Sequence, residues 1–185
     1  MKKFLIISFV AAFAACNSGT DNAKVDSMKS SSDSSMMDTL SYPYTAQYSS
    51  KFAIGDPNHS LTVLKLYKDW DNNTLDNSKN LFADFDTLHF ADGSMMAGSR
   101  DSVLAAAKQF RNTMSSVTSV VQAWIPLKST DRNENWVTVW FTELRTATNG
   151  KKDSSYMQET WRLNKDGKVD LLYQYAAQPM PPAKR

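Results

Sequence analysis

The segment FADFDTLHFADG, residues 82–93, places three aspartates and a histidine among aromatic residues. Such side chains could transfer protons or bind a metal ion if they pointed to one place. A strand over residues 86–91 would turn alternate side chains to opposite faces, so Asp86 and His89 would point apart. Asp92 and the glycine after it are typical of a turn. The pattern therefore favours a strand followed by a turn over a catalytic cluster.

Glu159 is the second residue that could do chemistry. In a strand formed by YMQETWRL it would share a face with Met157 and Trp161, and apolar neighbours raise the pKa of a carboxyl group. If this face lines a pocket, Glu159 would contact a ligand there. If it is the outer face, Glu159 would be a solvated carboxylate paired with Arg145 or Arg162.

The sequence contains no metal or nucleotide motif. DWDNNTLDNSKN spaces carboxylates and amides as a calcium loop does, but Thr74 and Asn80 stand where the loop needs a glycine and an acid. Zinc, phosphate-loop and serine-hydrolase signatures do not occur. We therefore predict neither a metal nor a cofactor.

Hydrophobic periodicity predicts the helices that position these residues. Apolar side chains recur at helical spacing in residues 59–73, with Ser60 as N-cap. A shorter helical stretch runs from Ser78 to Phe82, and Asp84 lies at its exit. The next helix has Ser99 as N-cap and an aspartate in its first turn, which suits the helix dipole.

The second half of the chain predicts an antiparallel sheet. Segments rich in Val, Trp, Tyr and Thr alternate with the polar turns NGKKDSS and NKDG. The predicted strands are residues 119–129, 135–148, 156–163 and 168–177. Helices followed by a meandering sheet indicate an α+β fold, here one domain over residues 58–178.

The N-terminus has the pattern of an export signal. In MKKFLIISFVAAFAAC two lysines precede an apolar run and small residues, so we interpret residues 1–15 as a signal peptide. FAAC resembles the lipobox of bacterial lipoproteins, in which the cysteine, here Cys16, becomes the lipidated first residue. We expect a lipid-anchored, extracytoplasmic protein of the bacterial cell envelope, which Cys16→Ser would release from the membrane.

Net charge and local composition predict the properties of the mature chain outside the folded domain. Removing two lysines from 21 basic residues leaves 19, equal to the 19 acidic ones, so nucleic-acid binding is not expected. Residues 16–40 are rich in Ser and Asp and predict a flexible tether after the lipidated cysteine. Residues 41–57 carry several aromatics and predict an extended segment packed on the domain, whereas residues 179–185 predict a disordered tail.

The order of these segments resembles SnoaL-like proteins of the nuclear transport factor 2-like (NTF2-like) superfamily. The resemblance covers residues 58–177 and rests on LYKDW, the FAD step, the GSRD step and NKDGKVDLLYQY. It implies a cone-like fold, with N-terminal helices packed in a strongly curved antiparallel sheet and a pocket at the open end. Members include isomerases, polyketide cyclases, dehydratases and non-catalytic binding domains, so the fold alone does not choose a function.

The resemblance also suggests which residues contact a ligand. In the ketosteroid isomerase pattern the proton-abstracting carboxylate falls on Phe90 and the second pocket acid on Glu159. An acid without a base cannot transfer a proton between carbons, which favours binding of a small apolar molecule without catalysis. The expected contact residues are Trp70, Phe90, Trp124, Met157, Glu159 and Trp161.

Two alternatives remain open. A cofactor-independent isomerase, dehydratase or hydrolase would use Glu159 or His89 together with tyrosines of the pocket. A structural or partner-binding dimeric domain would use the sheet, where Leu171, Tyr173 and Tyr175 form a row of large side chains. Relatives often pair through the sheet, so we expect a homodimer, which the mass in solution would reveal.

Overall fold

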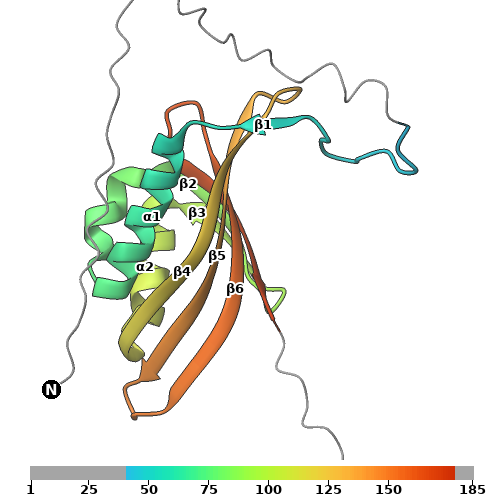
Figure 1. Cartoon of the computed structure of the whole chain (residues 1–185). Coiled ribbons are helices and arrows are strands. Elements are labelled where there is room, and N and C mark those ends of the chain that lie inside the picture. Colours follow the sequence, from blue (N-terminus) through green and yellow to red (C-terminus); the bar gives the residue numbers. More distant parts are fainter. Residues whose placement is uncertain (1–40, 178–185) are drawn as a thin grey trace, which may run out of the picture. The chain divides into compact units, whose positions relative to one another are not determined.

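The computed structural model describes residues 41–177 (Figure 1). The domain begins at Thr45, and the predictions for Cys16, the signal peptide, the tether and the tail lie outside the described residues. None of the helices in the described part of the chain is long and apolar enough to cross a membrane. The elements are β1 (Phe52–Ile54), α1 (Pro57–Asn72), the 3₁₀ helix η3 (Leu75–Leu81), β2 (Phe82–His89), β3 (Met95–Ser99), α2 (Arg100–Arg111), β4 (Met114–Ser129), β5 (Glu134–Ala147), β6 (Lys152–Leu163) and β7 (Val169–Ala176).

The strands form one mixed sheet with the order β1-β4-β5-β6-β7-β2-β3. All neighbours are antiparallel except β2 and β7, which are parallel, so the predicted fully antiparallel sheet is wrong at this pair. No hairpin fixes the relative direction of β2 and β7, because α2 and three long strands lie between them in the chain. The α+β class itself is confirmed.

The long strands β4, β5 and β6 bend along their length, and α1 and α2 lie on one side of them (Figure 1). Bulges interrupt the β4–β5 pairing at Met114/Ser116 and at Val121/Ala123, and bulges of this kind increase strand bending. The helix α1 contacts β4 and β5, and α2 contacts β2 and β3. Buried side chains from the helices and the sheet form the core between these layers, including Val63, Val103, Val137, Val139, Leu163 and Val169.

The helix α1 begins earlier than the sequence predicts. Its N-cap is Asp56, whose side chain accepts a hydrogen bond from the Asn58 backbone N–H at 2.8 Å. Ser60, the predicted cap, is buried within the helix instead. An aspartate followed by proline is the stronger start signal, because proline suits the first helical turn. The predicted cap of α2, Ser99, is confirmed.

The segment that opens with Phe82 is a strand from its first residue. Asp84 therefore lies within β2, and its predicted place at a helix exit is wrong. The Phe82 side chain is buried in the core, and its backbone pairs with Val169 of β7, so the strand already begins at this residue. Asp86 is fully buried, whereas His89 stacks on Tyr173 of β7 at 4.8 Å between ring centroids. The two side chains do not meet, as the strand alternation predicts.

The chain before α1 pairs with the C-terminal end of β4. Phe52–Ile54 pairs with Leu127–Ser129, and the Tyr48 ring packs edge-on against Trp136 at 5.8 Å. A Cβ on Gly55 would lie 3.0 Å from the Leu127 backbone, so a larger residue would need this backbone to shift by a few tenths of an ångström.

Candidate ligand-binding site

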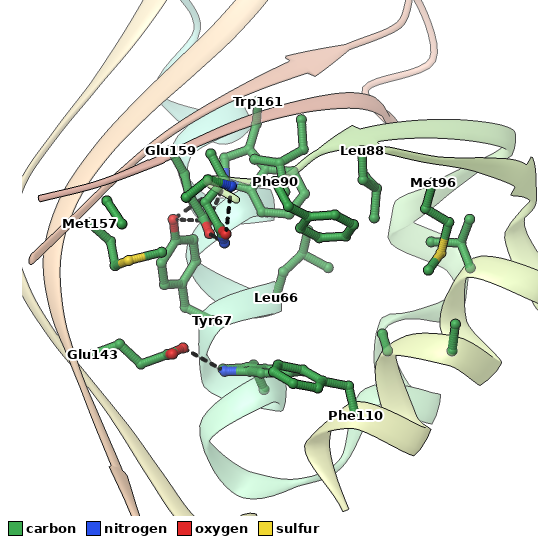
Figure 2. Close-up of a pocket in the computed structure, with 18 of the residues that line it drawn as sticks. Leu66, Tyr67, Leu88, Phe90, Met96, Phe110, Glu143, Met157, Glu159 and Trp161 are labelled. Carbon is green, nitrogen blue, oxygen red and sulfur yellow. Dashed lines mark hydrogen bonds between the residues drawn. The ribbon is translucent and has the colours of Figure 1, made fainter. Parts of the chain in front are cut away.

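A cavity of about 660 Å³ lies between the helices and the sheet. Its walls come from α1, η3, α2 and five strands, and most of them are apolar (Figure 2). The apolar lining includes Leu66, Leu75, Phe82, Leu88, Phe90, Met96, Val103, Leu104, Ala106, Ala107, Phe110, Phe141, Met157, Leu172 and Ala176. The volume is in the range of about 300–1,000 Å³ that is typical of small-molecule sites.

Glu159 is buried on β6 and faces this cavity (Figure 2). The Tyr67 hydroxyl of α1 donates to Glu159 Oε2 at 2.5 Å, and Trp161 Nε1 donates to the same oxygen at 3.1 Å. Gln174 Nε2, from the neighbouring strand β7, donates to Oε1 at 2.7 Å. Of the two orientations open in the sequence, the structure therefore has the inward one, where Glu159 pairs with neutral donors rather than with an arginine.

Opposing effects act on the proton affinity of this cluster. Burial raises the pKa of Glu159, and its hydrogen bonds from Tyr67 and Gln174 oppose that rise. The pKa of Tyr67 is also raised, first by burial and then by the negative charge of Glu159. The Tyr67 O–H and the Trp161 N–H are directed to the carboxylate, whereas the Gln174 amide uses one of its two N–H groups there and keeps the other.

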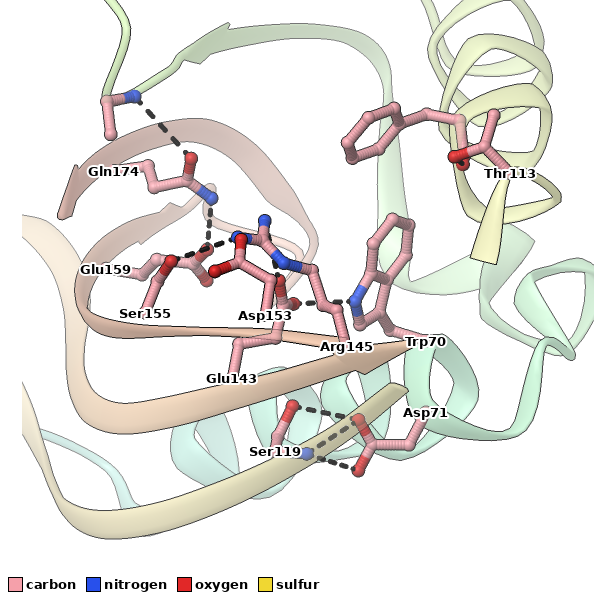
Figure 3. A network of polar contacts seen from close by, with 12 residues as sticks. Trp70, Asp71, Thr113, Ser119, Glu143, Arg145, Asp153, Ser155, Glu159 and Gln174 are labelled. Atoms are coloured by element: carbon pink, nitrogen blue, oxygen red, sulfur yellow. Dashed lines mark hydrogen bonds and ion pairs between the residues drawn. The ribbon is translucent and has the colours of Figure 1, made fainter. Parts of the chain in front are cut away.

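A second polar group lies along the cavity wall at Glu143 of β5 (Figure 3). Trp70 Nε1 donates to Glu143 Oε2 at 2.9 Å, and Arg145 Nη1 lies 3.4 Å from Oε1. Burial raises the pKa of Glu143 even though these two partners oppose the rise. The sequence prediction omitted Glu143, but its even spacing from Val139 and Phe141 along one strand was a signal that it faces inward.

Arg111 fixes the end of α1, which carries Trp70. The side chain is only 3% exposed, and its guanidinium donates to the carbonyl oxygens of Trp70 at 2.7 Å, Asp71 at 3.0 Å and Met114 at 2.9 Å. The Asp71 carboxylate in turn accepts hydrogen bonds from the Ser119 backbone N–H and hydroxyl (Figure 3). These contacts join α1, α2 and β4 at one point and so position Trp70 over the cavity.

Five of the six predicted contact residues line the cavity, namely Trp70, Phe90, Met157, Glu159 and Trp161. Trp124 does not line it and is 52% exposed, so its predicted role in this cavity is not supported. The bulge between Val121 and Ala123 changes the alternation of β4 just before Trp124. His89 also lies outside the lining, because it stacks on Tyr173. Residues 41–177 contain no group of three or more acidic, His or Cys side chains suited to a metal ion.

Comparison with known proteins defines the fold. No protein-family model matches the sequence, and no curated protein matches it. Among solved structures, an NTF2-like protein of unknown function from Exiguobacterium sp. 255-15 has a TM-score of 0.54 and 16% identity, covering 64% of this chain and 99% of its own. A second NTF2-like protein, from Burkholderia pseudomallei K96243, has a TM-score of 0.53 and 17% identity over 65% of this chain and 91% of its own. AusH from Aspergillus nidulans has a TM-score of 0.53 and 12% identity, covering 67% of this chain and 87% of its own.

These likenesses confirm the NTF2-like fold that the sequence resemblance implied. Sequence identities this low show the fold alone, so the function is argued from the residues of the site.

Proposed function

We propose that the protein is a lipid-anchored NTF2-like domain that binds a small, largely apolar molecule in its cavity without converting it. The observation that carries the proposal is the composition of the cavity: an extended apolar lining with two buried carboxylates, Glu159 and Glu143. Burying apolar ligand surface contributes roughly 25 cal/mol per Å². One polar group among apolar walls fixes a ligand's orientation.

The hydrogen bonds of Glu159 argue against catalysis. Proton transfer next to a carbonyl needs a base and also a donor that stabilises the charge forming on the substrate. At this end of the cavity Glu159 uses the single donors of Tyr67 and Trp161 and one of the two N–H groups of Gln174. In the ketosteroid isomerase pattern that the sequence resembles, the position of the base falls on Phe90. These features support binding over turnover.

Saturable binding of 1-naphthalenemethanol to the full chain, measured by titration calorimetry, is the expected result. Ala107 lines the cavity, so Ala107→Phe should fill the space and weaken binding by about tenfold or more. The matched control is Ala105→Phe, since Ala105 lies on the same helix but is exposed, and binding should be unchanged.

Two outcomes would contradict the proposal. Equal affinities for both phenylalanine variants would place the probe outside the cavity. Isomerase or hydratase turnover by the full chain that is lost in Glu159→Gln would show that the site is catalytic.

A further inference from the structure

Negative charge exceeds positive charge on the lining of the cavity. Three carboxylates, those of Asp92, Glu143 and Glu159, and one guanidinium, that of Arg145, belong to it. The guanidinium is shared, because Arg145 Nη2 lies 2.7 Å from Asp153 outside the lining and 3.0 Å from the Ser155 hydroxyl. Arg145 therefore balances only part of the negative charge in the cavity.

Glu159 is the carboxylate with least compensation. No Lys, Arg or His in residues 41–177 lies within ion-pair distance of it. Its three partners are neutral donors, and the negative charge of Glu143 raises its pKa further. Burying a carboxylate without a counter-charge is unfavourable, so a positive group on a ligand would relieve this cost.

Aromatic side chains lie on two sides of the open part of the cavity. Phe90 and Phe110 lie on opposite sides of the open space (Figure 2), and Trp70 stacks on Phe110 at 6.2 Å with an interplanar angle of 23°. Aromatic rings attract an organic cation through their negative faces and pack against an apolar body at the same time. The walls therefore suit both parts of an amine with a hydrocarbon body.

We infer that the ligand is a small organic cation, whose apolar body lies between Phe90 and Phe110 and whose protonated amine donates to Glu159. The inference rests on the proposed binding function and specifies the chemical class of the ligand. Oε1 of Glu159 accepts a single hydrogen bond, from Gln174, and so retains acceptor capacity for an ammonium group. Among these three side chains a neutral carbonyl ligand would find only the second N–H of Gln174 left to donate, and an anion would face two carboxylates.

A matched series of probes separates these classes: 1-naphthylmethylamine, 1-naphthalenemethanol and 1-naphthoate share one ring system and differ in charge. In titrations of the full chain at neutral pH, we expect the amine to bind about tenfold or more tightly than the alcohol, and the naphthoate to bind least. Glu159→Gln should remove most of this preference, and Glu143→Gln should reduce it less. The control is Asp166→Asn, a loss of one negative charge in an exposed turn, which should leave the preference unchanged.

The pH dependence gives a test that needs no variant. The groups facing Glu159 are Tyr67 of α1, Glu143 of β5, Trp161 of β6 and Gln174 of β7. The Trp161 and Gln174 side chains do not titrate. Burial raises the pKa of both Glu159 and Glu143, and the amine stays protonated. Amine affinity should therefore increase between pH 5 and about pH 8, while alcohol affinity stays constant.

The outcomes distinguish this inference from the function on which it rests. Equal affinities for amine and alcohol, or amine affinity that decreases as pH rises, would overturn the cationic ligand but leave apolar binding in place. Absence of binding by all three probes would overturn the binding function as well.

Discussion

Asp86→Asn is expected to raise the free energy of unfolding at pH 8 by about 2–4 kcal/mol. Asp86 is fully buried, and within the described residues neither of its carboxyl oxygens has a hydrogen-bond partner. Burial, followed by the nearby negative charge of Asp170, raises its pKa from 3.8 to about 7, and the nearby Ala83 backbone N–H and then the charge of Arg100 oppose this only in part. The ionised form is therefore the destabilising one in the folded protein.

The sign of the effect follows from the two pKa values. The folded protein binds the Asp86 proton more tightly than the unfolded chain, so the stabilisation is fully present below the unfolded value of 3.8 and is lost as the pH rises to about 7. Each tenfold difference in proton affinity corresponds to about 1.4 kcal/mol, which gives at most about 4 kcal/mol before local relaxation. Asparagine stays neutral and does not incur this loss.

Urea unfolding of wild type and Asp86→Asn at pH 5 and pH 8 measures the difference. Between pH 5 and pH 8 the wild type should lose more stability than the variant. The pKa values of Glu143 and Glu159 are also raised, so these two residues add a decrease in stability that wild type and variant share. Asp166→Asn is the control, since it removes one carboxylate from an exposed turn. A variant less stable than wild type at pH 8 would show that the Asp86 carboxylate has a stabilising partner.

Arg111→Met is expected to lower the free energy of unfolding by about 3 kcal/mol or more. The substitution keeps much of the apolar stem but removes the donors to three carbonyl oxygens, two of them at the end of α1. Hydrogen bonds to charged groups contribute about 1.5–3 kcal/mol each. All three carbonyls would lose the arginine donor, and the Trp70 carbonyl would keep only the Asn73 backbone N–H. Arg111→Lys, with fewer donors, should lie between wild type and Arg111→Met.

Lys108→Met provides the comparison for Arg111. Lys108 lies on the same helix and pairs with Asp76 at 2.7 Å in an exposed ion pair, which contributes about 1 kcal/mol or less. Because Arg111 also positions Trp70, Arg111→Met should weaken probe binding in the cavity, whereas Lys108→Met should not. Equal stabilities of the two variants would contradict the proposed role of Arg111.

Much of the local structure could be predicted because its causes lie within a few residues. Ser99 precedes the first turn of α2 that it caps, and Gly150 and Gly167 adopt positive φ angles of 83° and 71° in the predicted turns. The alternation along β6 likewise places Met157, Glu159 and Trp161 on one face. The NTF2-like fold followed from the order of such local patterns rather than from any single motif.

Long-range contacts account for what could not be predicted. The parallel pairing of β2 with β7 and the inward orientation of Glu159 depend on which elements come together, because either face of β6 could line a pocket. The hydrogen bond from Tyr67 to Glu159 joins residues 92 positions apart, and that from Arg111 to the Trp70 carbonyl joins residues 41 apart. A periodic pattern determines which side chains share a face. Only the packing of helices against the sheet decides what that face meets, and so which carboxylates become buried in the cavity.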